Sequence, residues 1–318
     1  MPPITIEAPA KINLHLQVGD RRPDGFHDIE SLFLALAFGD TVCLEPLSGP
    51  PDSLEICMNW QPVGGKPAGK MPPTLPPEKN IVSRAVSVFR SRTGYDKGLK
   101  VTVEKRIPVG GGLGGGSSDA AAVLLALNRL AASDGAAPVS DTTLAEMGAS
   151  VGSDIPFFVS GACAAWVSGR GECIQAVDLP EAIRGLSLVL VNPGFASDTA
   201  GAYHQLDIAR GVNSGASSLR NVRDYFEKMP GEWPFVNDFL PVFQSDSEVG
   251  VAYQQIIACL RELGADFAGL SGSGSTCFGV FSEHNCAESS KGFLLKHWPL
   301  VIVTFPLAFR LQQCYNNK

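Results

Sequence analysis

Residues 107–121 read Ile107-Pro108-Val109-Gly110-Gly111-Gly112-Leu113-Gly114-Gly115-Gly116-Ser117-Ser118-Asp119-Ala120-Ala121, and six of them are glycine. Residues 99–107 before this stretch alternate as a strand does, and residues 120–130 after it are apolar nearly all round, as in a buried helix. A helix beginning here would have Ser117 or Ser118 as its N-cap. Because loop N–H groups and the positive end of the helix dipole then converge, the stretch predicts a phosphate-binding loop.

Other interpretations of this loop fit the residues less well. A flexible linker or plain tight turn is not expected between a strand and a fully apolar helix. A Walker A loop requires Gly-Lys-Ser/Thr after the glycines, which is missing here. The dinucleotide fingerprint G-x-G-x-x-G fits only loosely, and the acidic residue required about 20 positions later would be Asp134, inside a Ser-Asp-Gly turn.

The composition of the chain is that of a globular protein. Its 318 residues are 45% hydrophobic and 18% charged, and this length favours two domains over one. The net charge of −7 argues against a nucleic acid or an anionic membrane as a partner. The N-terminal residues lack the basic and apolar regions of a signal peptide, and no apolar run approaches the length of a membrane span.

Eight cysteines are scattered along the chain without C-x-x-C spacing. This pattern predicts buried, reduced thiols in a cytoplasmic protein. We expect no protein site dedicated to a metal ion.

Polar and apolar residues alternate in the expected strand 11–18. Its polar face carries Lys11, Asn13, His15 and Gln17. That face is either solvent-exposed or part of a site. Both interpretations are equally open for His15 and Gln17, whereas we favour a site for Lys11 and Asn13.

Several other segments have a clear local pattern. Asn80 is expected to cap a helix that ends near residue 92. Residues 62–77, with six prolines and three glycines, predict a long surface loop and not a domain linker. Residues 162–177 favour a hairpin at the edge of the first domain, and residues 186–192 a buried strand.

Two further segments carry candidate chemistry. Asp154 stands between Gly152-Ser153 and an apolar run, where a carboxylate is costly to bury unless it is paired. A second glycine–serine segment, within residues 268–281, leads into an expected strand. Taken alone, it leaves a tight turn and a ligand-binding loop equally open, but together with the first loop it predicts a flap over the same triphosphate.

The pattern P-x-x-G-G-L-G-G-G-S-S-x-A-A resembles the ATP loop of the GHMP kinase superfamily, which includes the galactokinase, homoserine kinase and mevalonate kinase groups. The resemblance implies ATP, with Mg²⁺, as the cofactor. The residues implied in ATP binding are Pro108, Val109, Gly110, Gly111, Gly112, Leu113, Gly114, Gly115, Gly116, Ser117 and Ser118. Asp119 beside them would contact the magnesium ion or simply stabilise the positive end of the helix.

Five more motifs resemble those superfamily members that phosphorylate the 2-hydroxyl of the cytidine diphosphate derivative of methylerythritol, in the non-mevalonate route to isoprenoid precursors. The motifs are Ala8-Pro9-Ala10-Lys11-Ile12-Asn13-Leu14, Arg22-Pro23-Asp24-Gly25-Phe26-His27, Gly152-Ser153-Asp154-Ile155-Pro156-Phe157-Phe158, Gly169-Arg170-Gly171-Glu172 and Asn237-Asp238-Phe239. Together with the glycine loops they cover most of the chain.

This resemblance implies roles for individual residues. Asp154 would take the proton from the acceptor hydroxyl or orient it, and Lys11 would pair with Asp154 and neutralise charge on the phosphoryl group. Phe26, where tyrosine is common in the family, would stack on cytosine, and His27 would bind the polar edge of that base. Asn13 would bind the methylerythritol hydroxyls or the diphosphate.

The implied fold is α+β with two domains, 1–165 and 166–318, and with ATP and substrate in the cleft between them. We expect a monomer or a weak homodimer. Two alternatives remain open. One is another GHMP small-molecule kinase, of the homoserine or mevalonate type, against which the Phe26–His27 pair argues. The other is an inactive nucleotide-binding relative, which would usually have lost Lys11, Asp154 or a glycine loop.

Overall fold

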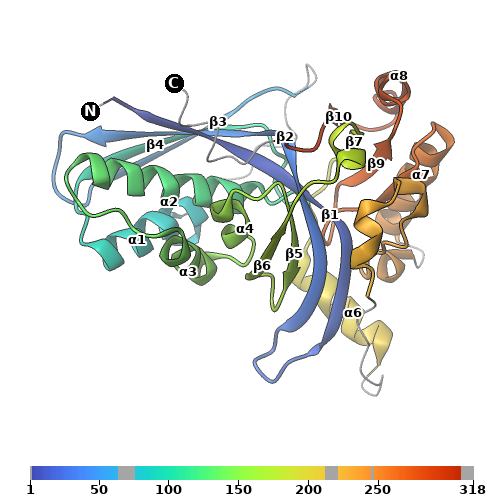
Figure 1. The fold of residues 1–318 in the computed structure, drawn as a ribbon, viewed down its shortest axis with the longest axis horizontal. Helices are drawn as coiled ribbons and strands as arrows, with labels where there is room; N and C mark the ends of the chain where they lie inside the picture. Colours follow the sequence, from blue (N-terminus) through green and yellow to red (C-terminus); the bar gives the residue numbers. More distant parts are fainter. Residues whose placement is uncertain (1, 64–75, 212–220, 245–246, 309–318) are drawn as a thin grey trace.

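The structure is a computed structural model that describes residues 2–63, 76–211, 221–244 and 247–308. Most of the predicted surface loop 62–77 lies outside these residues. Two sheets form the framework, each covered by helices on one side (Figure 1). The α+β class predicted for the chain is thus confirmed.

The first sheet has six strands in the order β3-β4-β2-β5-β6, with β1 paired to β2. Its strands are β1 (Ile4–Arg21), β2 (His27–Leu47), β3 (Leu54–Trp60), β4 (Gly98–Lys105), β5 (Ala164–Ser168) and β6 (Cys173–Val177). The strand predicted over residues 11–18 lies within the longer strand β1. The strand continues because register shifts near Pro9 and His15 absorb the irregularities without ending the pairing with β2.

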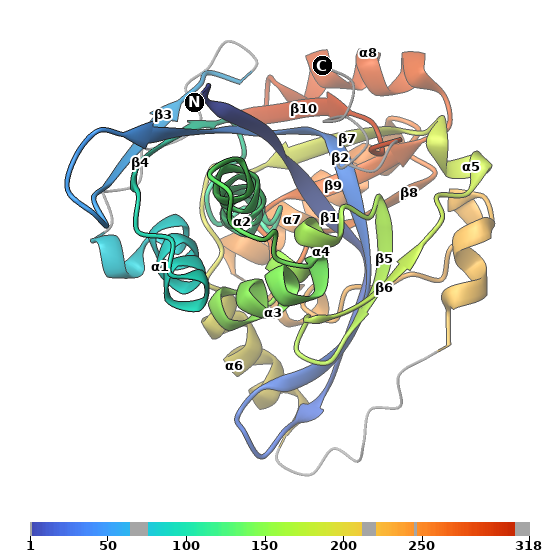
Figure 2. The same ribbon diagram turned by 60° about the vertical axis from the view of Figure 1, so that its left-hand side comes forward.

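Helices cover one face of this sheet, as Figure 2 shows. They are α1 (Ile81–Thr93), α2 (Gly115–Ser133), α3 (Asp141–Val151) and α4 (Ile155–Ser160). Asn80 caps α1 as predicted, accepting a hydrogen bond from the Val82 N–H. The apolar character of α2 on nearly every side is explained by its position, because β1 and β2 pack on one side of it and α1, α3 and α4 on the others.

The second sheet has four strands in the order β10-β7-β9-β8. They are β7 (Ser187–Asn192), β8 (Phe267–Leu270), β9 (Cys277–Phe281) and β10 (Leu300–Thr304). Helices α7 (Glu248–Glu262) and α8 (His284–Leu294) pack on this sheet. The short helix α5 (Glu181–Arg184) precedes β7, and α6 (Thr199–Arg210) follows it. Every residue of β7 is buried, as predicted. Within the described ranges, no helix has the length and apolarity that crossing a membrane would require.

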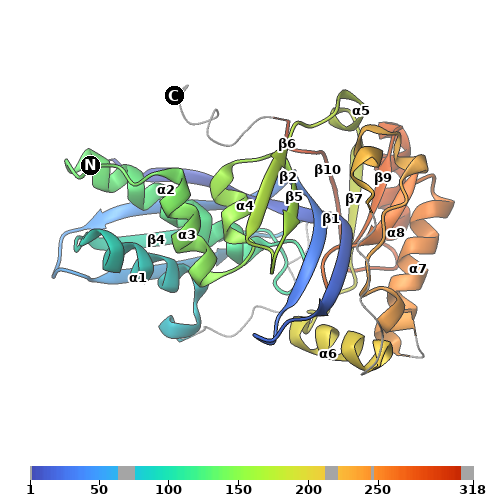
Figure 3. The same cartoon turned by 60° about the horizontal axis from the view of Figure 1, so that its bottom comes forward.

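The long β1–β2 ribbon runs between the two halves of the molecule (Figure 3). One hydrophobic cluster joins Ile12 and Leu34 of this ribbon to Leu190 of β7 and Phe278 of β9. The boundary expected at residue 165 falls inside β5, and β6 continues the first sheet through Val177. The hairpin stays with the first sheet because β5 pairs antiparallel with β2, and β6 pairs antiparallel with β5.

Candidate active site

The first glycine loop joins β4 to α2, but the helix begins earlier than predicted. Helix α2 starts at Gly115, and Gly114, with a φ of 70°, is its N-cap. The serine N-cap predicted at Ser117 or Ser118 is wrong, since both lie in the first helical turn and Ser118 N–H bonds to the Gly114 carbonyl at 2.9 Å. Glycine can replace the serine cap here because the left-handed conformation at residue 114 suits it alone.

The second glycine loop, 271–276, is hydrogen-bonded to the first. Ser271 Oγ donates to the Gly112 carbonyl at 2.8 Å, and Thr276 N–H donates to the Gly111 carbonyl at 3.1 Å. A Cβ atom on Gly112 would collide with the Ser271 carbonyl oxygen. The two loops therefore form one unit, and glycine is required at their contact. Whether the second loop covers a triphosphate stays a prediction.

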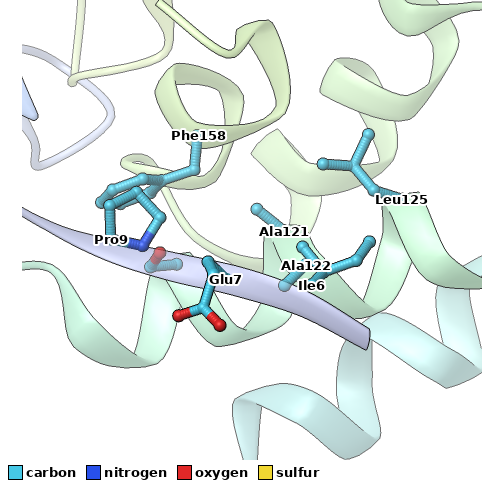
Figure 4. A pocket seen from close by; sticks show the side chains of 8 residues that line it. Ile6, Glu7, Pro9, Ala121, Ala122, Leu125 and Phe158 are labelled. Atoms are coloured by element: carbon cyan, nitrogen blue, oxygen red, sulfur yellow. The ribbon is translucent and has the colours of Figure 1, made fainter. Parts of the chain in front are cut away.

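Side chains contribute little to the open surface of the first loop. Val109 is exposed, whereas Leu113 is buried beneath the loop. Ser118 is buried too, and its hydroxyl has no hydrogen-bond partner among the described residues. Ser118 is one of the residues that line a small hollow between β1, α2 and α4. Figure 4 shows this hollow with Pro9 of β1, Ala121 of α2 and Phe158 of α4 around it. A ligand at this loop would therefore meet mainly backbone N–H groups and Ser117.

Lys11 and Asp154 lie together beside the glycine loop. Lys11 Nζ is 3.5 Å from Asp154 Oδ2, so the predicted pairing is confirmed. The Lys11 N–H donates to the Leu113 carbonyl at 2.9 Å, which fixes β1 against the loop. The Asp154 side chain, just before α4, is 30% exposed, whereas that of Lys11 is almost fully buried. The carboxylate is thus the accessible member of the pair.

Asn13 orients Lys11 in this structure. Its Oδ1 accepts a hydrogen bond from Lys11 Nζ at 2.7 Å, and its Nδ2 donates to Ser31 Oγ at 2.8 Å. The ammonium group of Lys11 also lies 4.4 Å from the centre of the Phe33 ring. Contacts with an amide, a carboxylate and an aromatic face fix the position of the positively charged ammonium group of Lys11.

Phe26 and His27 are adjacent in the chain but contact different elements. Phe26 is 52% exposed, and the guanidinium of Arg170, from the turn between β5 and β6, lies 4.9 Å from its ring centre. His27 is buried and stacks on Tyr203 of α6, with ring centres 5.2 Å apart. The exposed ring of Phe26 is available for stacking on a ligand.

Both ring nitrogens of His27 already have protein partners. Nδ1 lies 3.1 Å from the Gly19 carbonyl, which can only accept, and Nε2 lies 3.3 Å from Asp207 Oδ1. To bind the edge of a base, the ring would have to exchange its contact with Asp207. The predicted role of His27 therefore stays a prediction.

Tyr203 was missed by the sequence reasoning. Its ring stacks on that of His27, a predicted site residue. Burial, and to a smaller extent Asp154, raises the pKa of Tyr203 to about 12, so its hydroxyl stays protonated at neutral pH. No local pattern points to it, since a tyrosine in a polar helix is common.

A buried ionic cluster behind the loop was missed as well. Lys105 Nζ bonds to the carboxylates of Asp40 and Asp119, and Asp40 also accepts the Ile107 N–H at 2.8 Å. Burial raises the pKa of Asp119, as does the charge of Asp40, while Lys105 opposes this rise. The signal was present in β4, where Lys105 follows Val101 and Val103 on the buried face and so required an acidic partner.

His15 and Gln17 are buried, so the solvent-exposed interpretation of this strand face is wrong. His15 Nδ1 accepts a hydrogen bond from the Val236 N–H at 3.1 Å. Burial lowers the pKa of His15. Residues 235–239 cover this part of β1. The alternation of polar and apolar residues alone could not show whether the polar face of the strand meets solvent or another part of the protein.

Comparison with known proteins is consistent with this geometry. The model of the GHMP kinases N terminal domain matches residues 80–162, and that of the GHMP kinases C terminal domain matches residues 252–299. A 4-diphosphocytidyl-2-C-methyl-D-erythritol kinase of Anaeromyxobacter sp. (strain K) is 38% identical over 290 residues, which are 89% of this chain and 82% of that protein.

The chain belongs to the 4-diphosphocytidyl-2-C-methyl-D-erythritol kinase family. Another member, from Treponema pallidum (strain Nichols), is 36% identical over 94% of this chain and 97% of its own length. A crystal structure of 4-(cytidine 5'-diphospho)-2C-methyl-D-erythritol kinase superposes with a TM-score of 0.72, at 28% identity over 95% of this chain and 98% of the other. As a member of this kinase family, the chain is an ATP-dependent small-molecule kinase.

Proposed function

We propose that the protein transfers the γ-phosphoryl group of ATP to the 2-hydroxyl of 4-diphosphocytidyl-2-C-methyl-D-erythritol. The observation that carries this proposal is the Lys11–Asp154 pair, held against the glycine loop in a chain of this family. A homoserine or mevalonate type of acceptor is not favoured, because the relatives that align over most of the chain carry the other name.

In the proposed reaction, ATP lies with its phosphates on the loop 110–116 at the start of α2. Backbone N–H groups and the helix dipole stabilise the charge of the phosphates there. Asp154 orients the acceptor hydroxyl and receives its proton, and Lys11 offsets the charge that spreads over the oxygens of the transferring group. Positioning of this kind is the main contribution that a protein makes to phosphoryl transfer.

The methylerythritol substrate is proposed to bind along the β1–β2 ribbon. Phe26 would stack on the cytosine, and the guanidinium of Arg170 already lies over the Phe26 ring. His27 would bind the polar edge of the base, and Asn13 the methylerythritol hydroxyls or the diphosphate. Tyr203 joins this group because its ring stacks on that of His27. A pocket that combines stacking with a few polar contacts suits a nucleotide derivative.

Magnesium would enter with ATP and would offset part of the negative charge of its phosphates. Among the described residues, no group of three His, Cys, Asp or Glu side chains could hold a metal ion by itself. Asp119 fits a metal ligand poorly, because it is buried and bonded to Lys105 at 2.6 Å. A phosphate-bound ion needs only one or two protein ligands, so this arrangement agrees with a Mg²⁺–ATP substrate.

The location and assembly of the protein belong to the same proposal. No disulfide joins any two of the seven cysteines in the described part of the chain, which suits the reducing cytoplasm, although only Cys163 and Cys277 are buried as predicted. We propose a cytoplasmic enzyme that acts on a small molecule without a nucleic-acid partner, as a monomer or a weak homodimer.

Phosphorus NMR tests the reaction directly. Incubation of the protein with Mg²⁺–ATP and 4-diphosphocytidyl-2-C-methyl-D-erythritol is expected to give ADP and one new phosphomonoester resonance, while the diphosphate signals of the substrate remain. Homoserine and mevalonate serve as alternative acceptors. Turnover of either of these in place of the cytidine compound would overturn the proposal, and no turnover of any acceptor would indicate an inactive relative.

A further inference from the structure

Asn237 and Asp238 lie on a segment that pairs with the middle of β1. The Leu16 N–H donates to the Val236 carbonyl at 2.8 Å, and the Asp238 N–H donates to the Leu16 carbonyl at 3.0 Å. Adjacent residues of an extended segment direct their side chains to opposite sides. The two side chains here do so, and they reach different parts of the proposed site.

Asn237 is bonded to the second glycine loop. Its Nδ2 donates to the carbonyls of Leu270 and Gly272, at 2.7 and 2.8 Å. These two carbonyls flank Ser271, whose hydroxyl donates to the Gly112 carbonyl of the first loop. Because Asn237 Oδ1 also accepts the Phe239 N–H at 2.9 Å, the orientation of the amide is set. Asn237 thereby determines where Ser271 meets the first loop.

Asp238 is bonded instead to the elements that carry the substrate residues. Its Oδ2 accepts the Val18 N–H at 2.9 Å and Arg210 Nη2 at 2.8 Å. Arg210 Nη1 in turn donates to the Val18 carbonyl at 2.7 Å. Asp238 and Arg210 thus hold the end of α6 against the part of β1 that leads into the Phe26 hairpin.

Helix α6 and this part of β1 also provide the partners of His27. Tyr203 and Asp207 of α6 contact its ring, and the Gly19 carbonyl lies next to its Nδ1. If the Asp238–Arg210 pair is broken, the helix and the strand are free to move apart. Both sides of the His27 environment would then change, while the glycine loops keep their own hydrogen bonds.

We propose that Asn237 and Asp238 are positioning residues with separate tasks, Asn237 for ATP and Asp238 for the cytidine substrate. The inference rests on the proposed function, which places ATP at the glycine loops and the cytidine compound at Phe26 and His27. If the two residues only held the halves of the molecule together, loss of either would affect both substrates alike.

The test compares Asn237→Asp with Asp238→Asn, since each exchange keeps the size of the side chain. We expect Asn237→Asp to raise the KM for ATP about tenfold, because a carboxylate cannot donate to two carbonyls, with the KM for the cytidine compound within about twofold. Asp238→Asn is expected to raise the KM for the cytidine compound about tenfold, with the KM for ATP within about twofold, because it leaves Arg210 without its charged partner. Asn285→Asp and Asp224→Asn are the matched exposed controls.

Second variants cover the possibility that one of these proteins fails to fold. Ser271→Ala should reproduce the effect of Asn237→Asp, and Arg210→Gln that of Asp238→Asn, with melting temperatures measured for all. Both KM values rising together, or neither rising, would overturn the inference. Calorimetric titration with ATP alone keeps the test independent of the acceptor. If wild-type protein fails to turn over the cytidine compound, the proposed function fails. A loss of ATP affinity confined to the Asn237 and Ser271 variants would still support the role of Asn237. Unchanged ATP affinity in these variants would refute that role.

Discussion

The two proposed binding regions of this protein are built on different principles. Where the two glycine loops meet, backbone groups take part in every contact described above, as where the Thr276 N–H donates to the Gly111 carbonyl, and a Cβ atom on Gly112 would collide with the second loop. Around Phe26 and His27 the contacts are made by side chains from β5–β6 and α6. Backbone recognition requires a continuous run of glycine, whereas side-chain recognition collects residues from distant parts of the chain.

The Lys11–Asp154 pair connects these two regions, and the largest effect of a substitution on turnover is expected there. Asp154→Asn keeps the shape of the side chain beside Lys11 but removes the proton acceptor. We expect kcat to fall on the order of a hundredfold or more, with both KM values and the melting temperature little changed. Steady-state kinetics and thermal unfolding of the two proteins check this. Turnover close to the wild-type rate would show that Asp154 has another role.

Gly112→Ala tests the backbone region. The added methyl group would meet the Ser271 carbonyl, and the residue has a φ of 74°. Strain of about 1–3 kcal/mol and displacement of the second loop are both expected, so the KM for ATP should rise by tenfold or more. The KM for the cytidine compound should stay near the wild-type value.

Gly135→Ala is the matched control for this exchange. Gly135 also has a positive φ, of 92°, but an added methyl group there would have no atom of the described residues within 4 Å, apart from its chain neighbours. Gly135→Ala should lower the stability of the protein without changing the KM for ATP. Equal KM values for ATP in the two variants would contradict the contact between the loops as the cause.

Phe26→Ala tests the side-chain region. Loss of stacking on cytosine is expected to weaken binding of the cytidine compound by about 1–3 kcal/mol, while ATP binding is unchanged. Because the ring is half exposed, the melting temperature should change little. Phe26→Tyr, which keeps the ring, is the control and should be nearly neutral. Unchanged affinity of the alanine variant, measured by calorimetry, would remove Phe26 from the substrate site.

Asp119→Asn is expected to change turnover least of the four and to alter the pH dependence of stability. Burial raises the pKa of Asp119 to about 7, against about 3.9 in the unfolded chain. Between these values the folded state holds a proton that the unfolded state has lost, so this residue makes stability fall as pH rises from about 4 to 7.

Urea unfolding at pH 5 and pH 8 measures this effect. The free energy of unfolding should fall less over this interval for Asp119→Asn than for wild type. Asp224→Asn, at an exposed position in the same protein, should follow wild type. If the free energy of unfolding changes equally between pH 5 and pH 8 in all three proteins, Asp119 does not titrate in this range.

Much of the ATP side could be read from the sequence because its requirements are local. A glycine run, a preceding strand and a following apolar helix are set by backbone conformation within a few residues. The same holds for α1 with its Asn80 cap and for the buried strand β7. The exact start of α2 was missed, since a glycine with positive φ can cap a helix as well as serine does.

The sequence by itself determined which side chains would need partners, and the tertiary structure decided which partners they have. Lys11 and Asp154 were recognisable as candidates, but the register of β1 against the loop brings them to 3.5 Å. Lys105 and Tyr203 are ordinary residues in their own segments, and Asp238 was marked only as part of a motif, with no partner indicated. They matter because strands and helices from both halves pack around the β1–β2 ribbon, and such long-range pairing leaves no periodic signal in the chain.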